Sequence, residues 1–195
     1  MVAKSSSRSQ DILQALARML QESRGGRITT AALASELGVS EAALYRHFPS
    51  KTRMYEGLID FIEETIFARV NAIINDEPDA INQCYRIIGL TLTFAEKNPG
   101  ISRLLHGDAL TGETIRLHER IAQFFKRLDS QLKQILREAE IRQGIKINVP
   151  ISVAVDILLV FLEGKISQFV RSDFKQAPTQ YLPEQWPLLK RQLFG

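Results

Sequence analysis

Apolar residues recur at steps of three and four along almost the whole 195-residue chain, and this spacing limits the possible folds more than any other feature. Side chains spaced in this way share one face of an α-helix, whereas a half-buried strand alternates with a period of two. No strand-like alternation, internal repeat or low-complexity segment interrupts the pattern. The sequence therefore predicts an all-α protein of about nine helices.

Glycine and proline indicate where these helices end. Gly25-Gly26 ends the first helix, Pro49 follows the third, and Gly144 ends the helix that begins near Thr114. Asn98-Pro99-Gly100 is a strong break, because proline cannot continue a helix and glycine favours turns. The sequence predicts further helices over residues 30–37, 41–48, 51–75, 80–96, 101–110, 114–143 and 150–172, followed by a C-terminal stretch that packs back.

Two of the expected helices indicate what they pack against. The helix over 114–143 combines an apolar stripe with a charged outer face and is locally similar to a coiled coil. The helix over 150–172 is apolar nearly all the way round, so it must be covered on all sides. In a chain of this size we expect a second copy to provide the cover, with Gly164 allowing close approach. The sequence thus predicts a homodimer through the C-terminal helices.

Charge is unevenly distributed along the chain. The whole sequence has a net charge of +3, but residues 1–55 carry eight Lys or Arg and four acids, which leaves residues 56–195 near neutral. A basic N-terminal part on a neutral body is what phosphate binding requires. A chance fluctuation on a solvated surface remains the alternative.

Several classes of function are not favoured. Cys84 is the single cysteine, so no internal disulfide forms and a reducing compartment is expected. The three histidines lack metal-ligand spacing, and neither paired carboxylates, a nucleophile–base pair nor a glycine-rich phosphate loop is found. The N-terminus has no signal-peptide run, and the apolar stretch 153–162 is far shorter than the roughly 20 residues of a membrane span. We therefore expect a soluble cytoplasmic protein, not an enzyme, without metal or cofactor and without membrane contact.

Residues 29–48 carry the most informative motif, which predicts a helix-turn-helix. Ala34 is small where two helices cross, and Gly38 can adopt the positive φ that a tight turn requires. Ser40 stands where an N-cap accepts a backbone N–H of the second helix. The apolar seam between the helices is formed by Leu33, Leu37, Val39, Leu44 and Phe48.

The second helix of this motif leaves a distinct set of side chains exposed. Ala42 and Ala43 are small and allow deep entry into a major groove, and Tyr45 and His47 can hydrogen-bond bases or phosphates. Glu41 and Arg46 share that face, while Thr29, Thr30 and Lys51 stand at helix starts, where phosphates bind. The predicted DNA-binding residues are Thr29, Thr30, Ser40, Glu41, Ala42, Ala43, Tyr45, Arg46, His47 and Lys51. An ordinary helical hairpin without a ligand is the alternative.

The same residues resemble a known family. Ile28-Thr29-Thr30, Leu44-Tyr45-Arg46-His47-Phe48 and Pro49-Ser50-Lys51 are similar to the DNA-binding head of the tetracycline-repressor (TetR) family. The resemblance implies a three-helix head followed by a helical dimerisation body. The polar, serine-rich residues 1–10 predict a flexible arm. The resemblance implies a DNA-binding head over 11–55 and a dimerisation and partner-binding domain over 56–195.

Further segments resemble the branch of this family that acts in nucleoid occlusion, notably 96–100, 103–105, 169–175 and 186–188. The resemblance implies a nucleoid-associated dimer that binds chromosomal palindromes, engages the C-terminal tail of the division protein FtsZ and blocks Z-ring assembly. The matching groove positions for that tail are Phe61, Arg69, Leu90, Lys97 and Asn98. Core packing remains the alternative for Phe61 and Leu90. A ligand-responsive repressor with a small-molecule pocket remains the alternative function.

Overall fold

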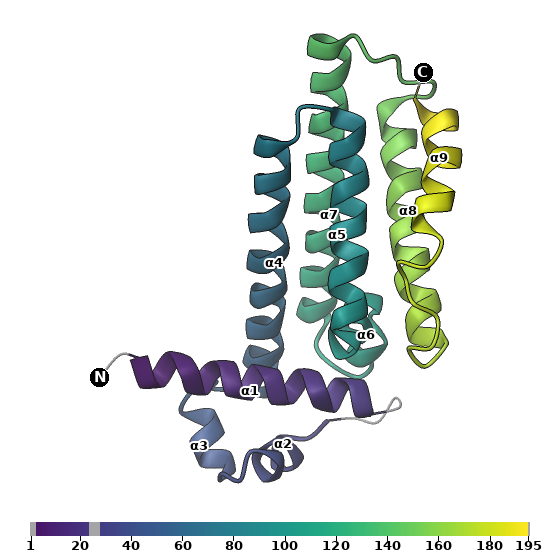
Figure 1. Ribbon diagram of the computed structural model, residues 1–195. Helices are drawn as coiled ribbons and strands as arrows, with labels where there is room; N and C mark the ends of the chain where they lie inside the picture. The colour runs from purple at the N-terminus through teal and green to yellow at the C-terminus, as the bar shows by residue number, and fades with distance from the viewer. Residues whose placement is uncertain (1–2, 24–27, 195) are drawn as a thin grey trace. The chain divides into compact units, whose positions relative to one another are not determined.

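The computed structural model describes residues 3–23 and 28–194, which are almost entirely helical (Figure 1). They form α1 (Ala3–Glu22), α2 (Thr30–Glu36), α3 (Glu41–Tyr45), α4 (Lys51–Asp76), α5 (Ala80–Lys97), α6 (Pro99–His106), α7 (Ile115–Glu138), α8 (Ile151–Arg171) and α9 (Leu182–Leu193). Apart from a bridge between Ile147 and Phe194, these residues contain no β-structure. The prediction of an all-α fold is confirmed. Within the described part, none of the helices is both long and apolar enough to cross a membrane.

Two helix ends near the N-terminus differ from the expectation. α1 begins at Ala3, so residues 3–10 are helical and continuous with the expected first helix. No glycine or proline interrupts this stretch, and Arg8 pairs with Asp11 one turn later at 3.8 Å. α3 ends at Tyr45, three residues before the expected end, and the chain continues as a turn over residues 46–47. The expected break at Gly25-Gly26 lies outside the described residues.

Two later helices are each followed by a turn with a different helical hydrogen-bond pattern, 3₁₀ after α6 and π after α7. Gly107 adopts a φ of 91° and ends α6, so the expected helix over 101–110 continues as a 3₁₀ turn, η1 (Asp108–Leu110). The expected helix over 114–143 is α7 followed by a π-helical turn, η2 (Ala139–Gln143). The left-handed residue Gly144 then stops the helix, as the sequence predicts.

The chain divides into two compact units. Unit 1 comprises Met1–Glu63 and Asn98–Ile121, and unit 2 comprises Glu64–Lys97 and Ala122–Gly195. The segment from α6 to the start of α7 belongs to unit 1 with the N-terminal helices.

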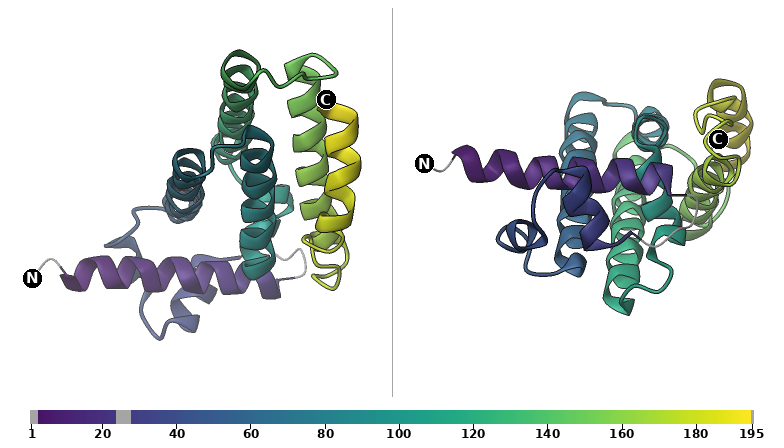
Figure 2. Two further views of the ribbon diagram at one scale, coloured as in Figure 1. Left: turned by 45° about the horizontal axis from the view of Figure 1, so that its top comes forward. Right: turned by 90° about the horizontal axis from the view of Figure 1, so that it is seen from below.

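In unit 1, α1 packs on α6 and on α2, and α2 packs on α3 (Figures 1 and 2). A Cβ added to Gly100 of α6 would lie 1.9 Å from the carbonyl oxygen of Ala17 in α1. Only glycine permits this close crossing, because no side-chain atom fits between the two backbones. The break that the sequence shows at positions 98–100 therefore also sets how closely α6 approaches α1.

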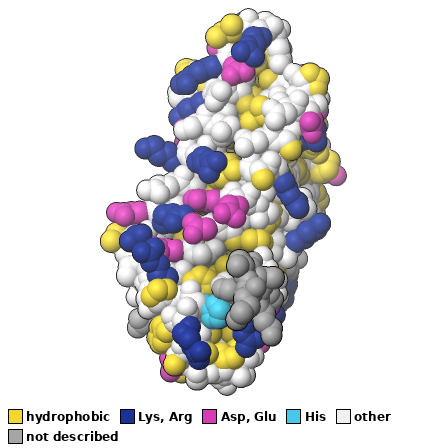
Figure 3. Space-filling model, turned by 90° about the vertical axis from the view of Figure 1, so that its left-hand side faces the viewer, with side chains coloured by type: hydrophobic (Ala, Val, Ile, Leu, Met, Phe, Trp, Pro, Cys, Tyr) yellow, Lys and Arg dark blue, Asp and Glu magenta, His cyan; other side chains and the backbone are white. Residues whose placement is uncertain are grey.

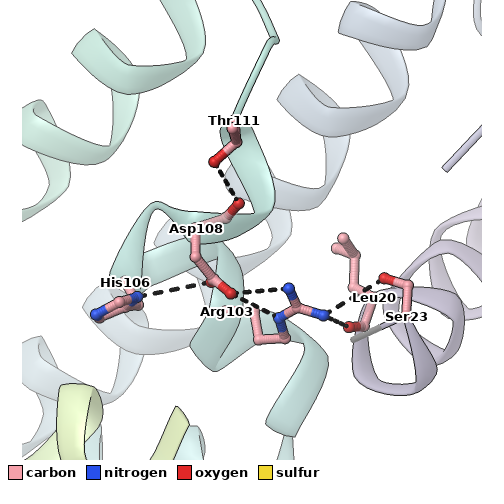
Figure 4. Close-up of polar contacts among 6 residues, drawn as sticks. All are labelled: Leu20, Ser23, Arg103, His106, Asp108 and Thr111. Atoms are coloured by element: carbon pink, nitrogen blue, oxygen red, sulfur yellow. Dashed lines mark hydrogen bonds and ion pairs between the residues drawn. The ribbon is translucent and has the colours of Figure 1, made fainter. Parts of the chain in front are cut away.

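Arg103 of α6 connects the same two helices through a buried polar network (Figure 4). Arg103 is 6% exposed, and its guanidinium donates to the Asp108 carboxylate at 2.8 and 2.9 Å. It also donates to the backbone oxygen of Leu20 at 3.0 Å and to the Ser23 hydroxyl at 3.4 Å. The buried positive charge is thus paired and hydrogen-bonded, as a charge in a protein interior must be. The contacts hold η1 beside the end of α1.

In unit 2, α5 packs against α8 and α9, which run side by side (Figures 1 and 2). Phe67 and Phe124 meet edge to face with ring centroids 5.5 Å apart, and Tyr85 contacts Trp186 at 5.3 Å. Cys84 lies in this interior, where burial and, to a smaller extent, the Asp79 carboxylate raise its pKa to about 12. The thiol is therefore neutral at physiological pH.

The two long amphipathic helices differ in how completely the chain covers them. The stripe of α7 that the sequence predicts is buried at Leu117, Ile121, Phe124, Leu128, Leu132 and Ile135. α8 buries only one side, at Ala154, Val155, Leu158, Leu162, Ile166 and Phe169. Its other side leaves Val153 43%, Ile157 36% and Val160 62% exposed. We call Val153, Ile157, Val160 and Gly164 the α8 stripe.

Candidate nucleic-acid interface

The helix-turn-helix is formed by α2, α3 and the turn between them. The Thr29 hydroxyl oxygen accepts the backbone N–H of Ala32 at 3.1 Å and caps α2. Ser40 caps α3 by accepting the N–H of Ala43 at 3.3 Å. Gly38 turns the chain between the two helices with a φ of +63°. The Ser40 cap and the turn at Gly38 were expected from the sequence, because turn and cap chemistry depends on local residue types; Thr29 was expected only as a phosphate contact.

The apolar seam beneath this surface is less uniform than expected. Leu33 and Leu44 are fully buried, at 1% and 0% exposed. The other three seam residues, Leu37, Val39 and Phe48, are half-buried. The two central leucines therefore hold α2 and α3 together, and the outer members form the edge of the contact.

The predicted recognition surface is exposed on one side of α3. Tyr45 is 42% exposed, and Glu41, Ala42 and Arg46 are exposed beside it. Ala43 is half-buried. Five residues of helix with two alanines make a narrow ridge, which suits entry into a major groove. The role of these residues in base contact stays a prediction.

His47 is placed differently from Tyr45. It is half-buried in the turn after α3, and its Nδ1 lies 3.5 Å from the Ser9 hydroxyl of α1. The imidazole therefore links the turn to α1 on one side and leaves only part of the ring accessible.

A chain of three side chains orients Tyr45. Its hydroxyl donates to the Thr30 hydroxyl oxygen at 3.2 Å, and Thr30 donates to the Glu41 carboxylate at 2.5 Å. These bonds connect the start of α2 to the start and end of α3. Holding an aromatic side chain in one rotamer before binding reduces the entropy lost on association.

Most basic side chains near this surface are engaged in ion pairs. Arg18 pairs with Glu36 at 3.7 Å, and Arg53 pairs with the buried Glu56 at 2.8 Å. Figure 3 shows acidic side chains among Lys and Arg on the face drawn there. Arg46 is exposed and has no ion pair within the described residues. Of the other Lys and Arg residues in positions 1–55, Arg24, Arg27 and the side chain of Lys4 lie outside the described part.

Lys51, which the sequence predicts as a phosphate contact, does not lie open to solvent. Its Nζ pairs with the carboxylate of Glu113, and its side chain is 20% exposed. Ser50 caps α4 by accepting the N–H of Arg53 at 3.2 Å. Sequence reasoning missed Glu113, because the contact joins positions 62 residues apart and no local pattern predicts it.

Two family descriptions match this chain. Residues 12–58, which include the helix-turn-helix, match "Bacterial regulatory proteins, tetR family". Residues 78–194 match the "Tetracyclin repressor-like, C-terminal domain" of the SlmA-like type. The nucleoid occlusion factor SlmA of Shewanella oneidensis is 56% identical over 186 residues, which cover 95% of this chain and 94% of that protein. The chain belongs to the TetR family, in its group of SlmA nucleoid occlusion factors.

Other relatives agree with this assignment. The nucleoid occlusion factor SlmA of Shewanella frigidimarina is 55% identical with the same coverage. Among solved structures, a TetR regulator from Haloarcula marismortui has a TM-score of 0.81 at 18% identity, covering 97% of this chain and all of that one. FadR from Bacillus subtilis has a TM-score of 0.80 at 16% identity, covering 94% and 98%. At such identities the structures support the TetR fold alone. The chain is thus a TetR-type DNA-binding protein of the SlmA group and not an enzyme.

The residues that resemble an FtsZ-tail groove in this group are accessible to different degrees. In unit 2, Arg69 of α4 and Lys97 of α5 are exposed, and Leu90 is half-buried. In unit 1, Phe61 is 47% exposed and Asn98 is half-buried at the start of α6. Core packing therefore does not account for Phe61. Tail binding itself stays a prediction.

Unit 2 also contains a cleft of about 720 Å³ where α4, α5 and the end of α7 meet. It is lined largely by polar side chains, including Asn71, Asn75, Gln83, Gln131, Gln134 and Gln143. Small-molecule sites are usually lined predominantly by apolar and aromatic side chains. This cleft therefore gives little support to the alternative of a ligand-responsive repressor.

Proposed function

We propose that this protein binds palindromic chromosomal sites as a homodimer at the nucleoid and, on DNA, engages the C-terminal tail of FtsZ to block Z-ring assembly. The observation that supports DNA binding is α3, a short helix capped by Ser40 that leaves Tyr45 42% exposed. Its kinship with nucleoid occlusion factors supports the division half.

In this proposal, α3 enters the major groove and the helix starts around it contact the backbone. Tyr45 and Arg46 read base edges or adjoining phosphates, with Ala42 allowing close approach. Thr29 lies at the exposed start of α2, where a hydroxyl and backbone N–H groups suit a phosphate. Because phosphate contacts dominate affinity, binding falls steeply as salt rises.

The α8 stripe supports the dimer. Val153, Ile157 and Val160 repeat at one helical face, and contiguous exposed apolar side chains are a mark of protein interfaces. A Cβ on Gly164 would meet nothing within 4 Å in the single chain, so this face has room for a closely packed helix. A two-fold dimer presents two α3 helices to two half-sites about one helical turn (~34 Å) or a multiple of it apart.

For the FtsZ tail, the exposed cations Arg69 and Lys97 supply the charge and the half-buried Leu90 an apolar contact. An acidic peptide with apolar anchors fits such a combination. Arg69 has no ion pair within the described residues, so its guanidinium is available to a carboxylate.

The DNA half is tested by footprinting across the chromosome of the source organism. We expect many sites spread over the chromosome and sparse near the replication terminus. A single site at the protein's own promoter would instead indicate plain repression and would contradict the proposal.

The FtsZ half is tested by fluorescence anisotropy of a labelled FtsZ tail peptide with the DNA-bound protein. We expect Arg69→Ala to weaken peptide binding about tenfold, the loss expected for one charge-assisted contact. DNA affinity should remain unchanged. Arg137→Ala, which removes an exposed arginine from α7, is the matched control and should bind the peptide normally. Equal peptide affinity in both variants would exclude Arg69 from the site.

A further inference from the structure

Lys51 stands at the first position of α4, directly after the helix-turn-helix, yet its charge is turned inward. Its Nζ forms an ion pair with Glu113 and lies 5.6 Å from the centre of the Tyr55 ring. Tyr55 is 1% exposed and the Glu113 side chain 8%, so both contacts lie on the inner side of α4. The cation is therefore already neutralised before any DNA binds.

Glu113 is held in place by a fixed turn. Its backbone N–H donates to the carbonyl of Leu110 at 2.9 Å, and Leu110 is fully buried. Thr111 donates to the carbonyl of Asp108 at 2.9 Å, and Asp108 accepts the buried guanidinium of Arg103 (Figure 4). The carboxylate thus stands on an anchored segment between α6 and α7.

We propose that Glu113 is an affinity-setting residue: its carboxylate occupies Lys51 in the place of a DNA phosphate, and DNA must displace it to gain that contact. This inference rests on the proposed DNA binding. A carboxylate and a phosphate both accept from an ammonium, so the two compete for one cation. Binding to a phosphate then trades one ion pair for another, and the net gain from Lys51 is small while Glu113 is charged.

Neutralising Glu113 removes the competitor. Each phosphate contact contributes about −0.9 to the slope of log affinity against log salt concentration. While the Lys51–Glu113 pair holds, the phosphate opposite Lys51 keeps its counterion, so in Glu113→Gln we expect the slope to steepen by about 0.9 for each protomer on the site. The affinity rises at 0.1 M salt by up to about eightfold per protomer, the factor that this slope implies relative to 1 M salt.

The test measures the affinity of wild type and variants for one palindromic DNA duplex by fluorescence anisotropy between 0.05 and 0.4 M salt, at about six concentrations. Glu119→Gln is the matched control, because it removes the same charge from an exposed residue of α7 that has no ion pair within the described residues. Glu113→Asp keeps the charge and should behave as wild type. Circular dichroism and thermal unfolding verify that each variant is folded.

Lys51→Gln completes a double-mutant cycle. In the Lys51→Gln background, Glu113→Gln should leave the salt slope unchanged, because residue 51 then has no ammonium group to contact a phosphate. The inference is overturned if Glu113→Gln matches Glu119→Gln, if it lowers affinity, or if its effect persists without Lys51. Salt-independent binding or no binding by wild type overturns the proposed DNA role as well, so the two failures are distinguishable.

Discussion

Two exposed helical surfaces of this molecule have opposite chemistry. α3 is five residues long, and its outer side chains are small, polar or charged, with Tyr45 tied to Thr30 and Glu41 by hydrogen bonds. α8 is 21 residues long and exposes the valines and isoleucine of the α8 stripe. The rest of the chain covers neither surface. A partner would bury apolar area on α8, whereas it would form hydrogen bonds with α3.

The difference indicates which partner each surface fits. Exposed apolar area is worth roughly 25 cal/mol per Å² when another apolar surface covers it, so the α8 stripe favours a second protein helix. Polar groups lose water on binding and gain only if new hydrogen bonds replace it, so α3 favours a partner with ordered donors and acceptors. A groove of DNA offers such a pattern.

We expect the largest effect on stability from a methyl group added at Gly100, in contrast to the same change at Gly164. Gly100→Ala places a Cβ 1.9 Å from the backbone oxygen of Ala17, so α1 and α6 must separate. We expect a loss of about 3 kcal/mol in the free energy of unfolding, at the upper end for overpacking. Urea denaturation measures it.

The matched change is Gly164→Ala on the α8 stripe, where a Cβ meets nothing within 4 Å. It should raise the free energy of monomer unfolding by up to about 1 kcal/mol through helix propensity. It should also raise the dimer dissociation constant, because the added methyl separates the helices. A destabilised monomer would contradict this account.

Val160→Asp tests whether the α8 stripe supports DNA binding through dimerisation. A charge at a residue 62% exposed costs the monomer little but is unfavourable inside an apolar interface. We expect a monomer by light scattering, and about a 100-fold loss of affinity for a palindrome as bivalent binding disappears.

Ile141→Asp is the control, because Ile141 is 83% exposed but lies outside the α8 stripe. It should remain dimeric and bind DNA normally. An unchanged dimer in Val160→Asp would show that another surface holds the protomers together.

Tyr45→Ala tests α3 alone. Loss of one base-reading side chain costs about 1–3 kcal/mol, so we expect roughly tenfold to hundredfold weaker binding to the specific site by gel shift. The oligomeric state should not change, in contrast to Val160→Asp. Tyr181→Ala removes a tyrosine 57% exposed in unit 2 and should have no effect on DNA. Intact site affinity in Tyr45→Ala would refute the assignment of α3.

The smallest expected effect concerns the orientation of Tyr45. Thr30→Val removes the hydroxyl that accepts from Tyr45, so the ring gains rotational freedom before binding. We expect a twofold to threefold loss of DNA affinity by anisotropy, consistent with about 0.5 kcal/mol for one exposed hydrogen bond. Thr30→Ser keeps the hydroxyl and should restore wild-type affinity; a loss of equal size in Thr30→Ser would contradict the orienting role.

Much of the interface could be predicted locally. Ser40 as a cap, Gly38 at positive φ and the buried Leu33 and Leu44 follow from residue types a few positions apart. The early start of α1 at Ala3 could not be predicted, because a polar serine-rich segment has no apolar period to mark it. The half-burial of His47 also escaped prediction, since it depends on Ser9 in another helix.

The sequence by itself determined the all-α fold, the helix-turn-helix and the apolar excess of α8, because helix periodicity, capping and turn formation act over a few residues. Only the tertiary structure decided that Glu113 neutralises Lys51, that Gly100 lies against Ala17, and which side of α8 stays uncovered. These features join positions far apart in the chain. Their energies come from packing and charge pairing, which depend on distances that no local pattern encodes.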